Sequence, residues 1–207
     1  MPRTQQLLDD LSGDTHFGVL IMAQLDAVPE TLQFIVSAAD EIPGQPALVD
    51  RRRYVVRAIG VAEHNLSLGL FNTIRILDEH PLLNAYNHDP TALFFRGQPD
   101  DASALFIDLM QAYASTFGPW RHPPQYLNTS KPLLSLLQSG GDLLGQMPLS
   151  LAQSLAAVLE LHGLETHMVS EPLKPDEHGR SRQRKVLILD ESYVIAFDFS
   201  VEYLGKA

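Results

Sequence analysis

The spacing of apolar residues along the chain predicts a mixture of helices and strands. Apolar positions recur every three or four residues over 102–117 and 151–159, the spacing of an amphipathic helix. An aspartate can cap the first of these helices, and Gly163 closes the second. A short helix is expected at 5–11. Residues 29–39 also show helical spacing behind Pro29, a residue suited to a first helical position.

Other apolar runs have the length and alternation of strands. Residues 17–25, 92–96 and 164–170 predict single strands. Two further pairs of runs predict β-hairpins. The first joins 53–62 to 66–77 through a two-residue turn at His64 and Asn65, and the second joins 185–189 to 193–203.

Helices and hairpins alternate here without the strand–helix–strand rhythm of parallel sheets. The pattern therefore predicts an α+β fold whose mainly antiparallel sheet is built from two β-hairpins with helices packed on it. The 207 residues, 45% of them apolar, are enough to bury one core. We expect a single domain over 1–207, with a helical appendage at 1–15 and a charged loop at 172–184.

Composition narrows the classes of function. The chain has no cysteine, which excludes disulfides, thiolate nucleophiles and iron–sulfur clusters. A cytoplasmic location and the absence of any membrane segment are expected, since no apolar run approaches the ~20 residues of a spanning helix. A net charge of −10 disfavours nucleic acid as a partner, because a phosphate backbone would be repelled.

Histidines and acids gather between 78 and 89. Asp78, Glu79, His80, His88 and Asp89 are residue types that bind zinc, iron or manganese, and they could serve a metal-dependent hydrolase. Their spacing matches no recognised ligand motif. Residues of these types are also common in solvated turns. Both interpretations are open.

Glycines suggest a second alternative. In the predicted first hairpin, Gly60 and Gly69 lie opposite each other on a face nearly bare of side chains, where a small ligand or nucleotide could approach the backbone. A closely packed helix would explain the same face. The Gly-rich run at 139–145 lacks the lysine of a phosphate loop, so we interpret it as a flexible connection.

Two surface segments are candidates for binding another protein. The loop 117–126 carries Trp120, Arg121 and Tyr126, the residue types that contribute most to interface energies, among prolines that pre-order it. Trp120 could instead fill the core. The charged loop contributes Arg180, Arg182 and Arg184, which could bind an acidic partner segment or an RNA, or simply remain solvated.

These observations favour a non-catalytic protein-binding accessory factor, an adaptor or chaperone-like protein. Interleaved helices and hairpins in an acidic chain resemble the general architecture of small acidic secretion chaperones, an analogy of fold that rests on no motif. No catalytic residues and no cofactor are assigned. The partner is expected to be another protein, bound at the two surface segments or by strand addition at a free sheet edge, and a homodimer is compatible with this.

Overall fold

A computed structural model describes residues 3–11, 16–41, 48–173 and 183–206 of the chain. The described residues form helices and mostly antiparallel sheets, which confirms the α+β class. Contacts divide the chain into two compact units. Unit 1 comprises Met1–Glu79 and Gln183–Ala207, and unit 2 comprises His80–Arg182. One domain over 1–207 stays a prediction.

Unit 1 contains two antiparallel sheets. Its five-stranded sheet has, in spatial order, β12 (Asp198–Lys206), β3 (Val49–Ile59), β2 (Thr31–Asp40), β1 (His16–Leu25) and β5 (Gly69–Phe71). Its four-stranded sheet has β4 (Glu63–Asn65), β11 (Ser192–Ala196), β10 (Lys185–Leu189) and β6 (Ile74–Leu77). The predicted strand at 17–25 is thus confirmed as β1.

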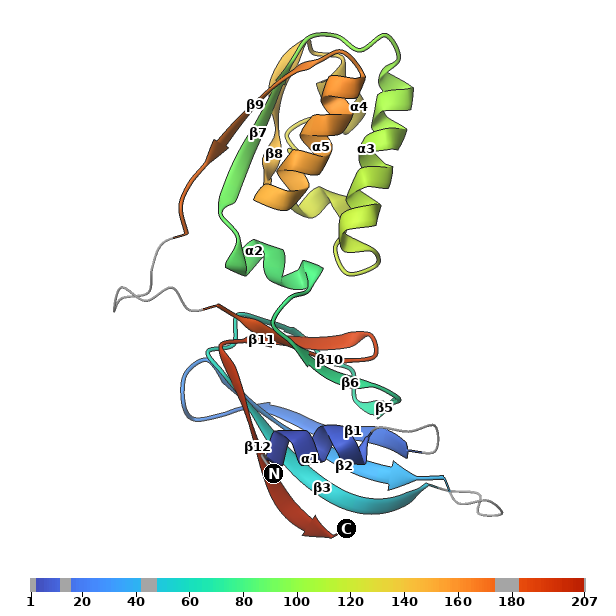
Figure 1. Cartoon of the computed structure of the whole chain (residues 1–207), viewed down its shortest axis with the longest axis vertical. Coiled ribbons are helices and arrows are strands. Elements are labelled where there is room, and N and C mark those ends of the chain that lie inside the picture. Colours follow the sequence, from blue (N-terminus) through green and yellow to red (C-terminus); the bar gives the residue numbers. More distant parts are fainter. Residues whose placement is uncertain (1–2, 12–15, 42–47, 174–182, 207) are drawn as a thin grey trace. The chain divides into compact units, whose positions relative to one another are not determined.

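The core of unit 1 takes side chains from both sheets. Phe34 and Val56 come from the five-stranded sheet, and Leu187 and Val194 from the four-stranded one. Helix α1 (Arg3–Asp10) adds Leu7, which is fully buried, and lies against the five-stranded sheet (Figure 1). The predicted short helix at 5–11 is therefore confirmed, and it closes part of the core.

The helix predicted at 29–39 is wrong, because this segment is strand β2. Leu32, Phe34 and Val36 alternate onto the buried face, a period of two that the same run of residues satisfies as well as helical spacing. Antiparallel pairing with β1 on one side and β3 on the other satisfies the backbone of β2. Long-range pairing, which the local pattern does not encode, thus decides the conformation.

The first predicted hairpin is also wrong. Strand β3 pairs with β2 and β12, and the run 66–77 does not pair with it. Residues 63–77 divide instead into β4, β5 and β6, which join β11, β1 and β10 respectively. The chain leaves β3 at Gly60, whose φ of +67° is a left-handed conformation that glycine adopts readily.

The last strand is shorter than predicted. Strands β10 and β11 are antiparallel neighbours, with Leu189 opposite Ser192. The run 193–203 divides at Phe197, however, and its second part, β12, pairs with β3 in the other sheet. One continuous apolar pattern therefore serves two sheets.

Unit 2 is a three-stranded antiparallel sheet with helices on one face (Figure 1). The strand order is β8 (Gly141–Pro148), β7 (Pro90–Arg96) and β9 (Glu165–Ser170), and β7 and β9 correspond to predicted strands. The larger helices are α3 (Ala102–Phe117), α4 (Leu133–Leu137) and α5 (Leu149–Leu161). Three short turns of helix complete the unit: η1 (Pro81–Leu83), α2 (Asn84–Asn87) and η2 (Pro123–Gln125).

The main helices of unit 2 form where the sequence predicts them. The Asp101 carboxylate accepts hydrogen bonds from the backbone amides of Ser103 and Ala104, at 2.8 and 3.0 Å, and so caps α3. Leu105, Leu109 and Leu155 are fully or almost fully buried against the sheet. None of the helices in the described ranges is long and apolar enough to cross a membrane.

Most of the Gly-rich run at 139–145 lies in a strand rather than in the predicted connection. Strand β8 begins at Gly141 and pairs with β7 as far as Pro148, with one register shift between Leu93 and Phe94. Gly145 faces the backbone of the preceding loop, and a side-chain carbon there would lie 2.1 Å from the Tyr126 carbonyl oxygen. The glycine therefore allows two backbones to approach closely.

Candidate functional site

The predicted metal-binding residues serve separate local roles. Asp78 belongs to unit 1, where its carboxylate lies 3.6 Å from the Lys185 ammonium. His80 belongs to unit 2 and caps η1, its Nδ1 accepting a hydrogen bond from the Leu82 amide at 3.3 Å. The His80 ring meets Trp120 edge-on, with centroids 5.3 Å apart. Burial lowers the pKa of His80 below its usual 6.5, so the imidazole is neutral at pH 7.

The other three members of that group are equally local, and the first of them, Glu79, is an exposed residue of unit 1. His88 follows the last turn of α2, and the Asp89 carboxylate accepts a hydrogen bond from the Leu173 amide at 2.9 Å. Across the described ranges, no three histidine, aspartate or glutamate side chains are grouped so that they could hold a metal ion. A hydrolase based on residues 78–89 therefore gains no support from the geometry.

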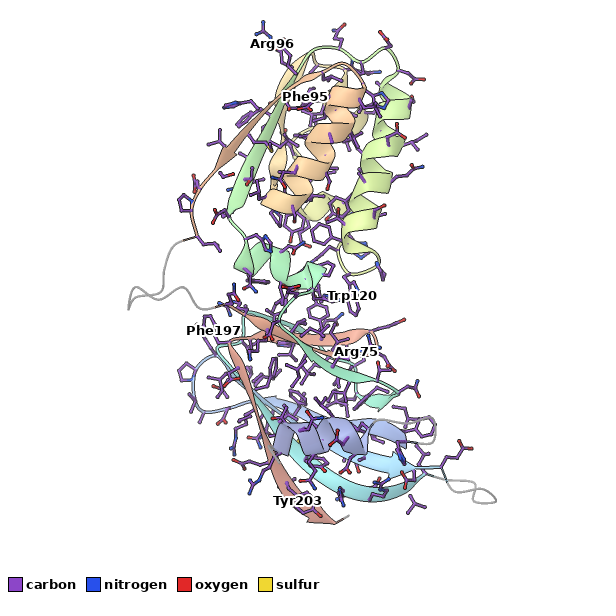
Figure 2. The ribbon with its side chains drawn as sticks, viewed as in Figure 1. Arg75, Phe95, Arg96, Trp120, Phe197 and Tyr203 are labelled. Atoms are coloured by element: carbon purple, nitrogen blue, oxygen red, sulfur yellow. The ribbon has the colours of Figure 1, made fainter. Side chains whose placement is uncertain are left out.

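The aromatic loop packs largely inward on unit 2. Arg121 is only 7% exposed, and the Tyr126 ring stacks on buried Phe117 with centroids 5.4 Å apart. Trp120, which is labelled in Figure 2, is half-buried and contacts His80. The Tyr113 hydroxyl donates to the His122 carbonyl oxygen at 2.8 Å, which fixes the loop. Partner binding by this loop stays a prediction, and its side chains offer little free surface for it.

One arginine of the charged loop can be placed, and two cannot. Arg180 and Arg182 lie outside the described residues. The Arg184 guanidinium donates to the Gly60 carbonyl oxygen at 2.8 Å and lies 4.2 Å from the centre of the Phe197 ring. Arg184 is thus bound to its own unit, and a role in partner capture stays a prediction.

The glycine-bare face does not form, because its hairpin does not form. Phe197 covers Gly60, and a side-chain carbon there would lie 2.2 Å from the Phe197 ring. Gly69 lies elsewhere, in β5, and among the described residues no atom comes within 4 Å of the position that its side chain would take. Gly69 is nevertheless informative, because the residues on either side of it border a pocket.

This pocket, in unit 1, has a volume of about 310 Å³. It lies between the segment that contains β5 and the turn from β10 to β11. Two groups of residues line it: Ser67, Leu68, Leu70 and Phe71 from the first segment, and Leu189, Asp190, Glu191 and Ser192 from the second. We call it the Leu68/Leu70 pocket.

Side chains of the β10–β11 turn hold the first segment at both ends. The Asp190 carboxylate accepts hydrogen bonds from the backbone amides of Asn72 and Thr73, at 2.8 and 2.9 Å, and from the Thr73 hydroxyl at 2.8 Å. At the other end, the Ser67 amide donates to the Ser192 hydroxyl at 3.0 Å. The pocket is therefore built into the fold of unit 1.

Buried side chains form its base and exposed leucines its rim. Phe71 and Leu189 are only 4% and 2% exposed, whereas Leu68 and Leu70 are each 65% exposed. The Phe71 ring lies directly over Gly18 of β1, where a side-chain carbon would be 2.0 Å from the ring. Because residue 18 is a glycine, the Phe71 ring can lie close to β1, and in this position it forms the base of the pocket.

The rim also carries negative charge. Burial raises the pKa of Asp190, but the hydrogen bonds from Asn72 and Thr73 outweigh this and hold it below the usual 3.8. Asp190 is consequently ionised at neutral pH. Glu191, the next residue, is exposed at the same rim.

A second polar cluster lies where α1 meets the five-stranded sheet. Asp10 accepts hydrogen bonds from the Tyr54 hydroxyl and from the Arg52 guanidinium, the latter at 2.7 and 2.8 Å. Arg51 bonds to Asp40 at 2.9 Å, and His16 lies 2.7 Å from Asp40. These groups satisfy one another between elements distant in sequence, so we assign the cluster to holding α1 in place.

Burial, together with the hydrogen bond to the Asp10 carboxylate, raises the pKa of Tyr54 to about 12. The Tyr54 phenol is therefore a permanent hydrogen-bond donor to Asp10 at neutral pH. The acid–base reactivity of a catalytic tyrosine is not expected from a group held in this way.

Sequence reasoning missed the Leu68/Leu70 pocket. The sequence predicts 66–77 as one continuous strand of a hairpin, whereas Leu68 and Leu70 of this run face solvent beside a pocket. A usable signal was the glycine between two leucines, followed by Asn72 and Thr73, which are turn-forming residues that end a strand.

Comparison with protein-family models, with curated proteins and with solved structures finds no match for this chain.

Proposed function

We propose that the chain is a non-catalytic protein-binding accessory factor that takes an apolar segment of its partner at the Leu68/Leu70 pocket. The observation that carries this proposal is the pair of leucines, each 65% exposed, at the rim of a cavity of about 310 Å³. Exposed leucines beside a hollow are the arrangement in which an incoming apolar side chain buries the most surface.

Preorganisation supports the proposal. Asp190 and Ser192 hold the leucine-bearing segment at both ends, and the buried Phe71 supports it from below. A rim that is already fixed loses little conformational entropy when a partner docks. Binding here would therefore use the free energy of apolar burial efficiently.

The charge of the rim argues against the nucleotide alternative. Asp190 and Glu191 would repel a phosphate group at the pocket. An uncharged small molecule is the second candidate, because the volume of about 310 Å³ is at the lower end of the range of ligand pockets. A screen of such molecules by thermal shift would reveal this role if ligand stabilisation is lost in Leu70→Ser.

Peptide selection tests the main proposal. A display library of random dodecapeptides is selected on the immobilised full-length chain, and the enriched peptides are then measured against Leu68→Ser/Leu70→Ser. We expect at least a tenfold loss of affinity, because two leucines supply most of the apolar contact at the rim.

Leu25→Ser is the matched control. Leu25 also lies in unit 1 and is 77% exposed, but it does not line the pocket. The control should bind the selected peptides with unchanged affinity. Peptides that bind the double variant as tightly as the unaltered chain would contradict the proposal.

A further inference from the structure

The Leu68/Leu70 pocket combines an apolar rim with negative charge. Leu68 and Leu70 form one side of it, and Asp190 and Glu191 lie on the other. Neither lysine nor arginine is among the residues that line it. A partner residue that fills the pocket thus meets apolar side chains and two carboxylates together.

The two carboxylates differ in what they can offer a ligand. Asp190 already accepts hydrogen bonds from two backbone amides and one hydroxyl, so it contributes its charge and few further bonds. Glu191 is exposed, and in the part of the chain that the structure describes its carboxylate has no hydrogen-bond or ion-pair partner. Glu191 is consequently the group that can form a new ion pair.

From this arrangement we infer that the pocket selects partner segments in which a lysine or arginine adjoins apolar residues. The inference rests on the proposed function and adds the chemistry of the occupant. The methylene stem of such a side chain packs on Leu68 and Leu70, and its cationic head reaches Glu191 in the field of Asp190. The overall charge of −10 adds attraction for basic segments during encounter.

Three synthetic peptides test this selectivity. Each has the sequence Gly-Ser-Leu-Xaa-Leu-Ser-Gly with blocked ends, and Xaa is Arg, Gln or Glu. The full chain, labelled at its leucine methyl groups, is titrated with each peptide, and affinity is read from the shifts of the Leu68 and Leu70 methyl signals. We expect the Arg peptide to bind about threefold more tightly than the Gln peptide, and the Glu peptide to bind most weakly.

Variants locate the source of the preference. Glu191→Gln should remove most of the preference for Arg over Gln while leaving affinity for the Gln peptide unchanged. Glu165→Gln, which changes the net charge equally at an exposed position in unit 2, should keep the preference. Raising the salt concentration to about 0.5 M should reduce the preference in the unaltered chain.

The possible results separate the two proposals. Equal affinity for the Arg and Gln peptides, with shifts at both leucines, overturns the charge selectivity and leaves the apolar site standing. A preference for Arg that survives in Glu191→Gln also overturns the inference, because it then arises elsewhere. Both proposals fail if none of the peptides shifts the Leu68 and Leu70 signals and the selected dodecapeptides bind Leu68→Ser/Leu70→Ser as tightly as the unaltered chain.

Discussion

The two units cover their sheets in different ways. In unit 2, α3 and α5 lie on one face of three strands, and the layer between them is apolar, with Leu93, Leu105 and Leu155 fully buried. In unit 1, two sheets share a core, and hydrogen-bonded charged groups such as Asp10 and Asp190 join elements at its margins.

The difference shows which kinds of side chain determine the fold of each unit. A helix packed on a sheet needs an apolar stripe at helical spacing, and burial of that stripe supplies most of the stability. Two sheets with many short strands also need devices that fix which strand ends meet. In unit 1 these devices are carboxylates that accept several hydrogen bonds each.

The largest effect expected from a single change is in the apolar layer of unit 2. Leu155→Ala removes a fully buried side chain from α5 and leaves a cavity, so the free energy of unfolding should fall by about 2–5 kcal/mol. Hydrogen exchange of the backbone amides of β7 and β8 measures the loss within the unit. Leu161→Ala, on the same helix but 81% exposed, should change stability by less than about 0.5 kcal/mol. Equal losses in the two variants would refute the assignment of the buried face.

A glycine substitution tests close packing in unit 1. Gly18→Ala places a methyl group against the buried Phe71 ring and should lower the free energy of unfolding by about 1–3 kcal/mol, measured by urea denaturation. Adding Phe71→Leu removes the ring that the methyl group meets. The double variant should therefore be more stable than the sum of the two single losses predicts. Strict additivity would mean that the contact is not the cause.

A substitution in the polar cluster around Asp10 should lower the stability of unit 1 by a smaller amount. It should also change how that stability depends on acid pH. Burial raises the pKa of Asp10, but the hydrogen bonds from Tyr54 and Arg52 outweigh it and hold the pKa below 3.8. A lowered pKa means that Asp10 stabilises the fold at pH values above 3.8, and that this contribution is lost as the pH falls through the pKa of the folded state.

Asp10→Asn should accordingly lower the free energy of unfolding by about 1–2 kcal/mol at pH 7. The variant should also lose less stability than the unaltered chain between pH 4 and pH 2. Circular dichroism during urea denaturation at several pH values measures both effects. Asp9→Asn, at the exposed neighbouring position, is the control and should leave the acid response unchanged.

Local signals predicted unit 2 better than unit 1 for a physical reason. The spacing of α3, its Asp101 cap and the Gly118 that follows it all lie within one stretch of chain, and the sequence predicts its bounds as the structure has them. Strand β3, by contrast, takes one neighbour from β12, about 140 residues further along. A hairpin partner close in sequence was the simpler prediction, and nothing local in 53–77 contradicts it.

The candidate site was hidden for the same reason. The pocket forms only because β5 joins β1 while the turn at Asp190 bonds to Asn72 and Thr73, more than 110 residues away in sequence. The residues chosen from the sequence were conspicuous types, such as Trp120 and Arg121, which the structure packs largely inward. Two ordinary leucines become noteworthy only once their exposure is known.

The division of the chain has a consequence for the order of folding during synthesis. Residues 80–182 are contiguous, so unit 2 can assemble as soon as they leave the ribosome, whereas β3, β4 and β6 must wait for β12, β11 and β10 at the far end. Until then these strands expose unpaired edges while a finished neighbour is already attached. Residues 183–206 thus complete the sheets that the earlier strands of unit 1 begin, and the nascent chain is most open to chaperones or proteases in that interval.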